Sequence, residues 1–381
     1  MDRGKTIREY LHEAHLVQLR KTVDAFYDPK TKQVLEFVKP LAEKCSQDEI
    51  SLPKLKETTL MSSDTVKKIA GTYLMKFRTL FDKQYIERLY NQGQNLLDKS
   101  SDVIEASIPE FVDEYKALRD RNKINLTTGK FATSGAGSNK QLFSPGFNIG
   151  LSGTYSDIPV VVHELTHNEV AKRSGDIANE SLPRGFQILV DEEIKSENQV
   201  YTSTPRMIME DLQRGGEVLR LLEFMETLPL KNESDGIISA LQILEKHTPG
   251  KWKKYDGYTE ADYNLNLQSS VPNELDEMEK QENLLSEIHK ALSLILSPSQ
   301  YFVGSSLGIG IAHNIRSGQS SAGQYIGMAK NDDLSNVASL IDAGLAMDTI
   351  EPAIISYVTK YRSLPKESEY HELDDSPLEK N

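Results

Sequence analysis

The order of apolar and polar residues along the chain predicts a mainly helical protein. Apolar residues recur every three or four positions, as on a helix with one buried face, in several long segments. These segments are 1–125, 206–228, 234–248, 275–296 and 332–361. One short stretch, "FNIGL" at 147–151, instead alternates apolar and polar residues as a half-buried strand does. We therefore expect an α+β fold that is mainly α-helical and carries a small β element.

Two further helices are expected in the middle of the chain, at 157–173 and 184–201. Asp157 suits the N-cap of the first of these helices, Pro159 suits its first turn, and Gly175 suits the position just past its end. The small β element precedes the first helix directly. This order places a strand, a helix and a second helix in one segment.

No long linker divides the chain before residue 364, so we expect one body with helical additions at both ends. The expected regions are an N-terminal helical region at 1–125, a central core at 126–215, a C-terminal helical region at 216–363 and a disordered acidic tail at 364–381. The most apolar stretch, 291–313, is interrupted by Pro298 and by serines, which predicts a buried segment and not a membrane span.

Composition narrows the partners and the chemistry. The formal net charge of −13 disfavours nucleic acid and anionic membrane surfaces as partners. The one cysteine, Cys45, excludes an internal disulfide and a metal site built on cysteines. The first residues show no apolar signal region, so we expect synthesis in the cytoplasm without an ordinary secretory signal.

The sequence "VVHELTHNEV" at 161–170 holds the strongest chemical signal. His163 and His167 are four residues apart, so on a helix their imidazoles lie on one face and can hold one metal ion. Glu164 then lies beside the open position of the metal, where it can accept a proton from water that the metal activates. This HExxH spacing is the signature of zinc metallopeptidases, and it predicts one Zn²⁺ per chain.

A catalytic zinc site needs a third protein ligand. Cysteine is excluded, and no third histidine follows at a known spacing, so an acid or a distant histidine is expected. A helical wheel of 184–201 places Glu193 and Glu197 within the apolar face of that helix and Asp191 and Glu192 outside it. Two acids on a buried face require a cation, and the zinc ion would supply it.

This pattern, HExxH followed by a glutamate on the next helix, resembles the gluzincin family of metallopeptidases. The resemblance implies a zincin-like core in 126–215, with Glu193 as the third ligand and Glu197 hydrogen-bonded to a ligating imidazole. The reverse assignment, or Glu192 as the ligand, stays open.

Zincins also use a downstream tyrosine or histidine to stabilise the oxyanion. The candidates in this chain are Tyr201, His313 and Tyr325.

The stretch 133–175 is also similar to a group of bacterial effector zinc proteases that are delivered into host cells. A Ser/Gly-rich segment and "FNIGL" lead into "HELTH", which is followed by a short charged helix end and a glycine. The polar, Glu-containing tail is similar to the secretion signals of type IV effectors. The resemblance implies translocation into a host cytosol and a host protein as the substrate.

The sequence therefore predicts a zinc-dependent endopeptidase that hydrolyses a peptide bond of a protein or peptide, with Glu164 as the general base. The alternative is a non-catalytic helical interaction or adaptor protein with an accidental or inactive HExxH. Stoichiometric zinc that is lost in His163→Ala would separate the two hypotheses. The sequence leaves the oligomeric state open.

Overall fold

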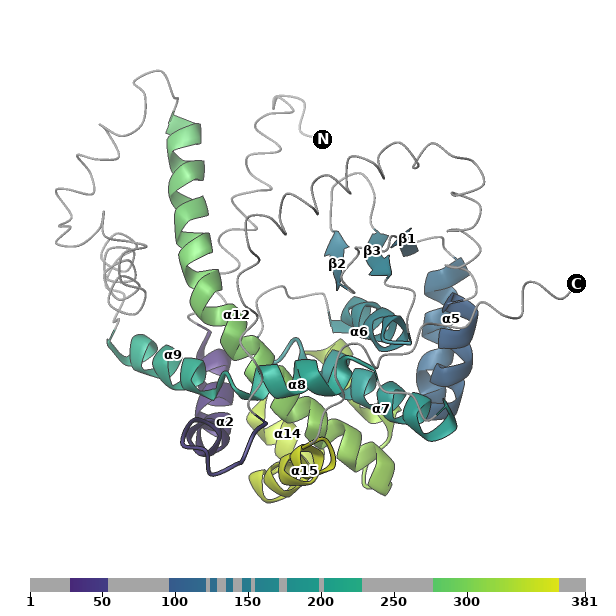
Figure 1. Ribbon diagram of the computed structural model, residues 1–381. Coiled ribbons are helices and arrows are strands. Elements are labelled where there is room, and N and C mark those ends of the chain that lie inside the picture. Colours follow the sequence, from purple (N-terminus) through teal and green to yellow (C-terminus); the bar gives the residue numbers. More distant parts are fainter. Residues whose placement is uncertain are drawn as a thin grey trace, which may run out of the picture.

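The computed structural model describes residues 28–53, 96–120, 124–128, 135–139, 146–151, 155–170, 177–198, 202–227 and 277–362. These segments form a body of packed helices with a small sheet on one side (Figure 1). The mainly helical class that the apolar pattern predicts is confirmed. Within the described segments, no helix combines the length and the apolar character that crossing a membrane requires.

The helices follow one another from α2 to α15. Residues 96–107 are also helical and lead into the short 3₁₀ helix η1. The bounds are α2 Pro29–Ser46, η1 Pro109–Phe111, α5 Val112–Asp120, α6 Asp157–Val170, α7 Ser181–Asn198, α8 Thr204–Leu212, α9 Gly215–Thr227, α12 Glu277–Ser317, α13 Ala322–Asn331, α14 Val337–Asp342 and α15 Met347–Lys360.

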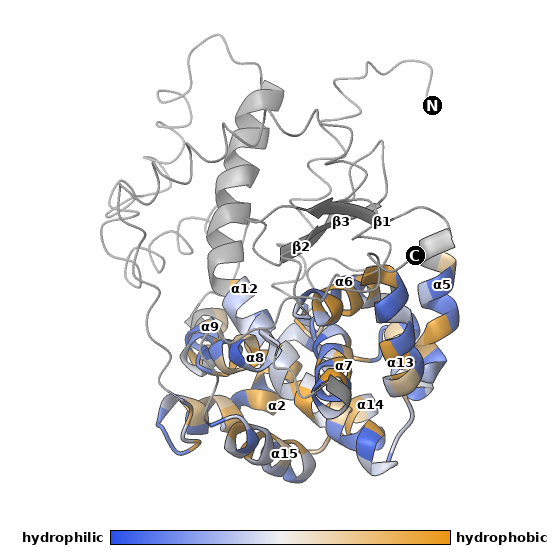
Figure 2. Cartoon of the chain, turned by 45° about the vertical axis from the view of Figure 1, so that its right-hand side comes forward, coloured by the Kyte–Doolittle hydropathy of each residue, from blue (hydrophilic) through white to orange (hydrophobic). Residues whose placement is uncertain are grey.

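Helix α7 occupies the middle of this body. Every residue from 181 to 190 is buried, because α6 and α12 both pack against α7 and α8 folds back beside it. The helices around α7 carry apolar residues on their inner faces and polar residues on their outer faces (Figure 2). Polar side chains at the start of α7 are therefore held in the interior of the protein.

Helix α12 is one continuous helix of 41 residues that runs through Pro298. The prediction of a helix that ends near 296 was wrong, whereas the prediction of a buried segment is confirmed, since residues 302–312 are buried. The serines that interrupt the apolar pattern do not break the helix, because polar groups can be satisfied inside the protein. Ser305, for example, donates a hydrogen bond to Asp211 at 2.8 Å.

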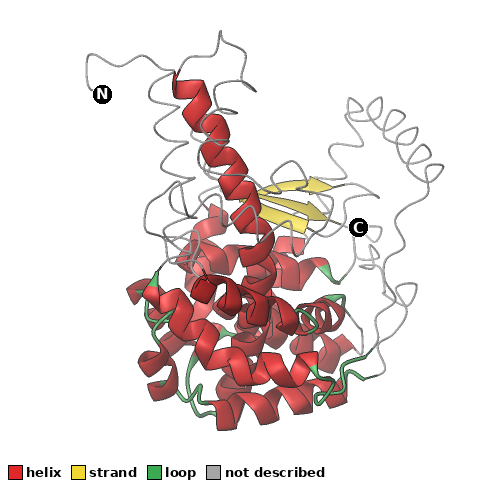
Figure 3. Ribbon diagram, turned by 90° about the vertical axis from the view of Figure 1, so that its left-hand side faces the viewer, coloured by secondary structure: helices red, strands yellow, loops and turns green. Residues whose placement is uncertain are grey.

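The small sheet consists of β1 Ile124–Thr128, β2 Gly135–Asn139 and β3 Gly146–Leu151 (Figure 3). The strand order is β1–β3–β2, with β1 parallel and β2 antiparallel to β3. Strands β2 and β3 contact α6. The sheet therefore covers the helix that carries HExxH, with β3 in its centre and β1 and β2 at its edges.

The C-terminal part of the chain forms the two helices α14 and α15. The single helix expected over 332–361 is divided into α14 and α15, because Gly344 adopts a left-handed backbone conformation with φ of 84°. Such a conformation cannot continue an α-helix, and it favours glycine. Helix α15 then packs against α12, which supports the buried segment from the other side.

Candidate metal centre

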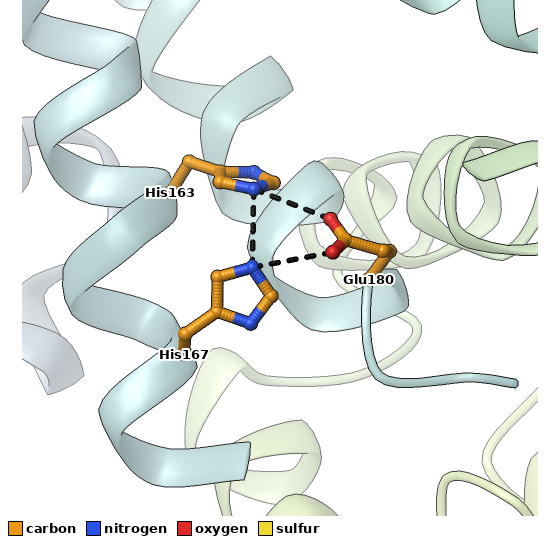
Figure 4. Close-up of side chains that lie close together, drawn as sticks. All are labelled: His163, His167 and Glu180. Carbon is orange, nitrogen blue, oxygen red and sulfur yellow. Dashed lines mark hydrogen bonds and ion pairs between the residues drawn. The ribbon is translucent and has the colours of Figure 1, made fainter. Parts of the chain in front are cut away.

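His163 and His167 lie one turn apart on α6 and point toward the start of α7 (Figure 4). Their Nε2 atoms are 3.2 Å apart, and the two rings are inclined at 83° with centroids 4.8 Å apart. The local helical geometry alone accounts for this, because residues i and i+4 share one face. Both histidines therefore present a ring nitrogen to the same point in space.

Glu180 supplies a third oxygen-bearing side chain to this point (Figure 4). It is the last residue of the turn that precedes α7, and its Oε2 atom lies 3.2 Å from His163 Nε2 while its Oε1 atom lies 3.5 Å from His167 Nε2. Across the segments that the structure describes, these three residues form the one group of potential metal ligands with this convergence. We refer to them as the His163–His167–Glu180 cluster.

The spacing of the cluster fits a tetrahedral metal ion. Ligand bonds of about 2.0–2.1 Å at tetrahedral angles separate the ligand atoms by about 3.3 Å, and the observed separations are 3.2–3.5 Å. The buried Oε2 of Glu180 has no hydrogen-bond partner of suitable geometry, nor does Nδ1 of His163. Two imidazoles and a carboxylate are among the ligand sets by which proteins bind zinc.

The surroundings shift the pKa values of the three residues of the cluster in different directions. Burial lowers the pKa of His163 to about 4, so this imidazole is neutral at pH 7. Burial alone would raise the pKa of Glu180, but hydrogen bonds and charges from the two histidines hold that pKa well below its usual range. Burial likewise opposes protonation of His167, but hydrogen bonding to Glu180 and the charges of Glu180 and Glu164 outweigh it and raise the pKa.

Glu164 is half-buried on α6, directly after His163 in the chain. Burial raises the pKa of Glu164, and the negative charge of Glu180 adds to this, while His167 and Arg184 oppose it. A carboxylate with a raised pKa holds a transferred proton better than an ordinary surface glutamate does. Such a group is suited to general acid–base chemistry near neutral pH.

Arg184 anchors the start of α7 one turn after Glu180. Its guanidinium forms an ion pair with Asp211 of α8 at 3.0 Å and donates a hydrogen bond to Gln187 at 2.8 Å. The ring of Tyr301 from α12 packs beside this guanidinium, with its centroid 5.5 Å from the central carbon. The turn that carries Glu180 is thus tied to two neighbouring helices.

The structure places Glu180, and not Glu193, beside the two histidines, so the arrangement of side chains does not support the metal-ligand role that the sequence predicted for Glu193. Glu193 is 13 positions further along the chain than Glu180, which corresponds to about 20 Å of helix. Glu192, the alternative, forms ion pairs with Arg316 and Lys360 at the other end of α7. The side chain of Glu197 lies outside the described residues.

The helical wheel failed because α7 has no single buried face. Asp191 and Glu192, which the wheel placed outside the apolar face, are 1% and 9% exposed, whereas Glu193 is only half-buried. A wheel assumes one buried side and one solvated side. A helix that is covered by neighbours on several sides does not meet that condition.

Of the three candidates for the oxyanion-stabilising group, the structure describes His313 and Tyr325. Tyr201 lies outside the described residues, and His313 is exposed on α12. The hydroxyl of Tyr325 is engaged elsewhere, since it donates to the carbonyl of Ala343 at 2.9 Å and accepts from Asn314. The described residues therefore assign this role to none of these three.

A local signal for Glu180 does exist in the sequence. The segment "NESLPRG" has a serine and a proline in positions typical of a first helical turn, which places the helix start at 181 and not at 184. Glu180 then stands immediately before a helix that follows the motif helix. Twelve residues separate it from His167.

Comparisons with known proteins leave this chain without a family. No family model and no curated protein matches its sequence. A structural match exists to a crystal structure provisionally assigned as an oligoendopeptidase F from Bacillus anthracis str. Ames. The match has a TM-score of 0.31 and 15% sequence identity, and it covers 88% of this chain but only 55% of that chain. A TM-score this low does not define a shared fold.

Proposed function

We propose that the chain is a zinc-dependent peptidase whose metal ligands are His163, His167 and Glu180. The observation that supports the proposal is the convergence of two Nε2 atoms and a carboxylate at 3.2–3.5 Å in the interior of the protein. A zinc ion bound there would supply a Lewis acid that polarises a scissile carbonyl and lowers the pKa of water. The structural match plays no part in this proposal.

The residues of the cluster and those around it would transfer the proton, bind the metal and hold Glu180 in place. The carboxylate of Glu164 accepts a proton from the attacking water and passes it to the leaving amine, for which its raised pKa is suited. Burial of His163 keeps its imidazole neutral, so that Nε2 offers a lone pair to the metal. The buried ion pair of Arg184 with Asp211 fixes the turn that presents Glu180.

A zincin-like core around α6 belongs to the same proposal. Strand β2 is an edge of the sheet and contacts α6, so its outer edge can pair with an extended peptide near the motif helix. Backbone pairing of this kind accepts many sequences, while side-chain contacts beside it give selectivity. A protein or peptide is therefore the substrate class that we propose.

The test joins metal analysis with a search for cleavage. We expect about one zinc per chain in the purified protein and loss of the metal in His163→Ala. A library of denatured proteins, incubated with the zinc-loaded enzyme, should gain new N-termini that mass spectrometry detects and that Glu164→Gln does not produce. A protein that binds no zinc after reconstitution would overturn the proposal and favour the helical interaction protein.

The resemblance to effector proteases adds a proposal about location. Delivery of the chain into a host cytosol rests on the sequence resemblance alone. A reporter fusion that is expressed in a bacterium with a type IV secretion system would test it, and a reporter confined to the bacterium would contradict it.

A further inference from the structure

The third ligand of the cluster lies directly against a glycine of a distant helix. Gly304 of α12 packs against Glu180 so closely that a Cβ atom on Gly304 would be 2.2 Å from the Cβ of Glu180. The same Cβ would be 3.1 Å from the carbonyl carbon and 3.2 Å from the Cα of Glu180. Any larger residue at 304 must therefore move the backbone that carries the carboxylate.

The close approach continues along both helices. One turn after Gly304, a Cβ on Gly308 would be 2.7 Å from the Cβ of Arg184 and 2.9 Å from the amide nitrogen of Gly185. On α7, a Cβ on Gly185 would be 2.9 Å from Ile311. Absence of side chains at these glycines lets the backbones of α7 and α12 touch, and the closest point of all is at Glu180.

Backbone conformation does not explain the glycine at 304. Gly304 lies inside α12 with a helical backbone, where alanine is the better helix former. Gly304 therefore does not favour the formation of α12, and its close contact with Glu180 explains why a residue without a side chain lies there. The contact sets the distance between α12 and the turn at Glu180, while α6, which carries the two histidines, packs against α7, α13 and the sheet.

We propose that Gly304 is a positioning residue for the metal site. The missing side chain at Gly304 lets the turn before α7 lie close to α12. That distance determines where the Glu180 carboxylate lies relative to the two imidazoles. A shift of the Glu180 backbone that relieves the 2.2 Å overlap would move the carboxylate away from the point that His163 and His167 share. The inference rests on the proposed metal site and concerns the residue that assembles it.

The helix offers a control at Gly310. A Cβ on Gly310 would be 2.9 Å from Leu345 and 3.1 Å from Ile350, which are side chains of the C-terminal part of the chain and not of the metal site. Gly310→Ala therefore crowds α12 against a different neighbour. Any effect of crowding α12 in general appears in this variant as well.

The experiment measures zinc affinity by competition with a chromophoric chelator, together with the visible spectrum of the Co²⁺-loaded protein. We expect Gly304→Ala to bind zinc about 10- to 100-fold more weakly than the wild type, as is typical when a group that orients a ligand is changed. Its Co²⁺ spectrum should lose the intensity of a tetrahedral site. Gly310→Ala should keep the wild-type affinity and spectrum, with thermal unfolding recorded for all variants.

A second variant decides the matter if Gly304→Ala does not fold. Gly308→Ala makes a smaller overlap one turn further along the same contact. We therefore expect its loss of zinc affinity to be smaller than that of Gly304→Ala and larger than that of Gly310→Ala. Equal affinity in the variant tested and in Gly310→Ala would overturn the inference. In that case a wild type that binds zinc leaves the proposed function standing, whereas a wild type without zinc removes both.

Discussion

The two ends of helix α7 hold buried acids in opposite ways. At its start, Glu180 faces two imidazoles, and its Oε2 atom lacks a hydrogen bond of suitable geometry. Near its other end, Asp191 accepts hydrogen bonds from Thr202 and Tyr361, and Glu192 forms ion pairs with two cations.

The two acids differ in whether the described part of the chain supplies a cation for the buried carboxylate. Burial of a charge is costly, and the protein offsets that cost at Glu192 with its own cations, Arg316 and Lys360. At Glu180 the neighbours within reach are imidazoles, one of which burial keeps neutral. The described residues place no lysine or arginine in an ion pair with Glu180, so we propose that a bound metal ion supplies the positive charge there.

We expect the largest change in zinc content when Glu180, the acid at the start of α7, is replaced. Glu180→Ala removes the carboxylate from the cluster, so we expect zinc to fall from about one per chain to a small fraction of that value, because two histidines alone bind weakly. Elemental analysis after gel filtration measures it. Glu193→Ala is the matched control on the same helix and should keep its zinc; a loss in Glu193→Ala but not in Glu180→Ala would reverse our assignment.

A smaller effect separates binding from catalysis. Glu164→Gln keeps the shape of the side chain but removes the proton acceptor, so we expect peptide hydrolysis to fall by about 10²- to 10⁴-fold. Zinc content should stay at the wild-type value, because Glu164 is not a member of the cluster. Wild-type activity in this variant would exclude Glu164 as the general base.

The raised pKa of Asp191, near the other end of α7, should make the stability of the protein depend on pH. Burial raises the pKa of Asp191 to about 6, partly offset by hydrogen bonds from Thr202 and Tyr361 and by the charges of Lys195 and Lys360. Because the folded pKa lies above the unfolded value of 3.8, the folded protein binds more protons between these pH values. Stability should therefore fall as pH rises from about 4 to 6, by about 3 kcal/mol from this group.

Asp191→Asn tests this expectation, because the amide does not titrate. Urea unfolding at pH 4 to 8 should show no such decrease in the free energy of unfolding of the variant. The stability of the variant relative to the wild type should therefore increase as pH rises. Exposed Asp342→Asn serves as the control and should follow the wild-type profile. A profile for Asp191→Asn parallel to that of the wild type would contradict the raised pKa.

The smallest expected effect concerns the ion pairs of Glu192. Its side chain is 8% exposed, but its partners Arg316 and Lys360 are 42% and 41% exposed and can regain water when the pair is lost. We therefore expect Glu192→Gln to lower the free energy of unfolding by only about 1–2 kcal/mol. Zinc content should not change, and a loss of zinc here would show that the two ends of α7 are not independent.

Much of the helical framework was predictable because its causes are local. The helix predicted to begin at Asp157 does begin there. Prediction failed where packing overrode local signals: α12 continues through Pro298. Helix α7 begins at Ser181, three residues before the predicted start at 184, so the acids of the predicted helix did not include Glu180.

The local sequence is enough to place His163 and His167 on one face of a helix with Glu164 beside them, because residues four positions apart are neighbours on a helix. Which acid lies beside these two imidazoles depends instead on tertiary packing. That choice depends on where the turn before α7 meets α6, and so on a backbone contact with Gly304, which is more than a hundred residues away in the chain. A helical pattern carries no information about the depth at which two helices touch, because that depth is set by both partners together.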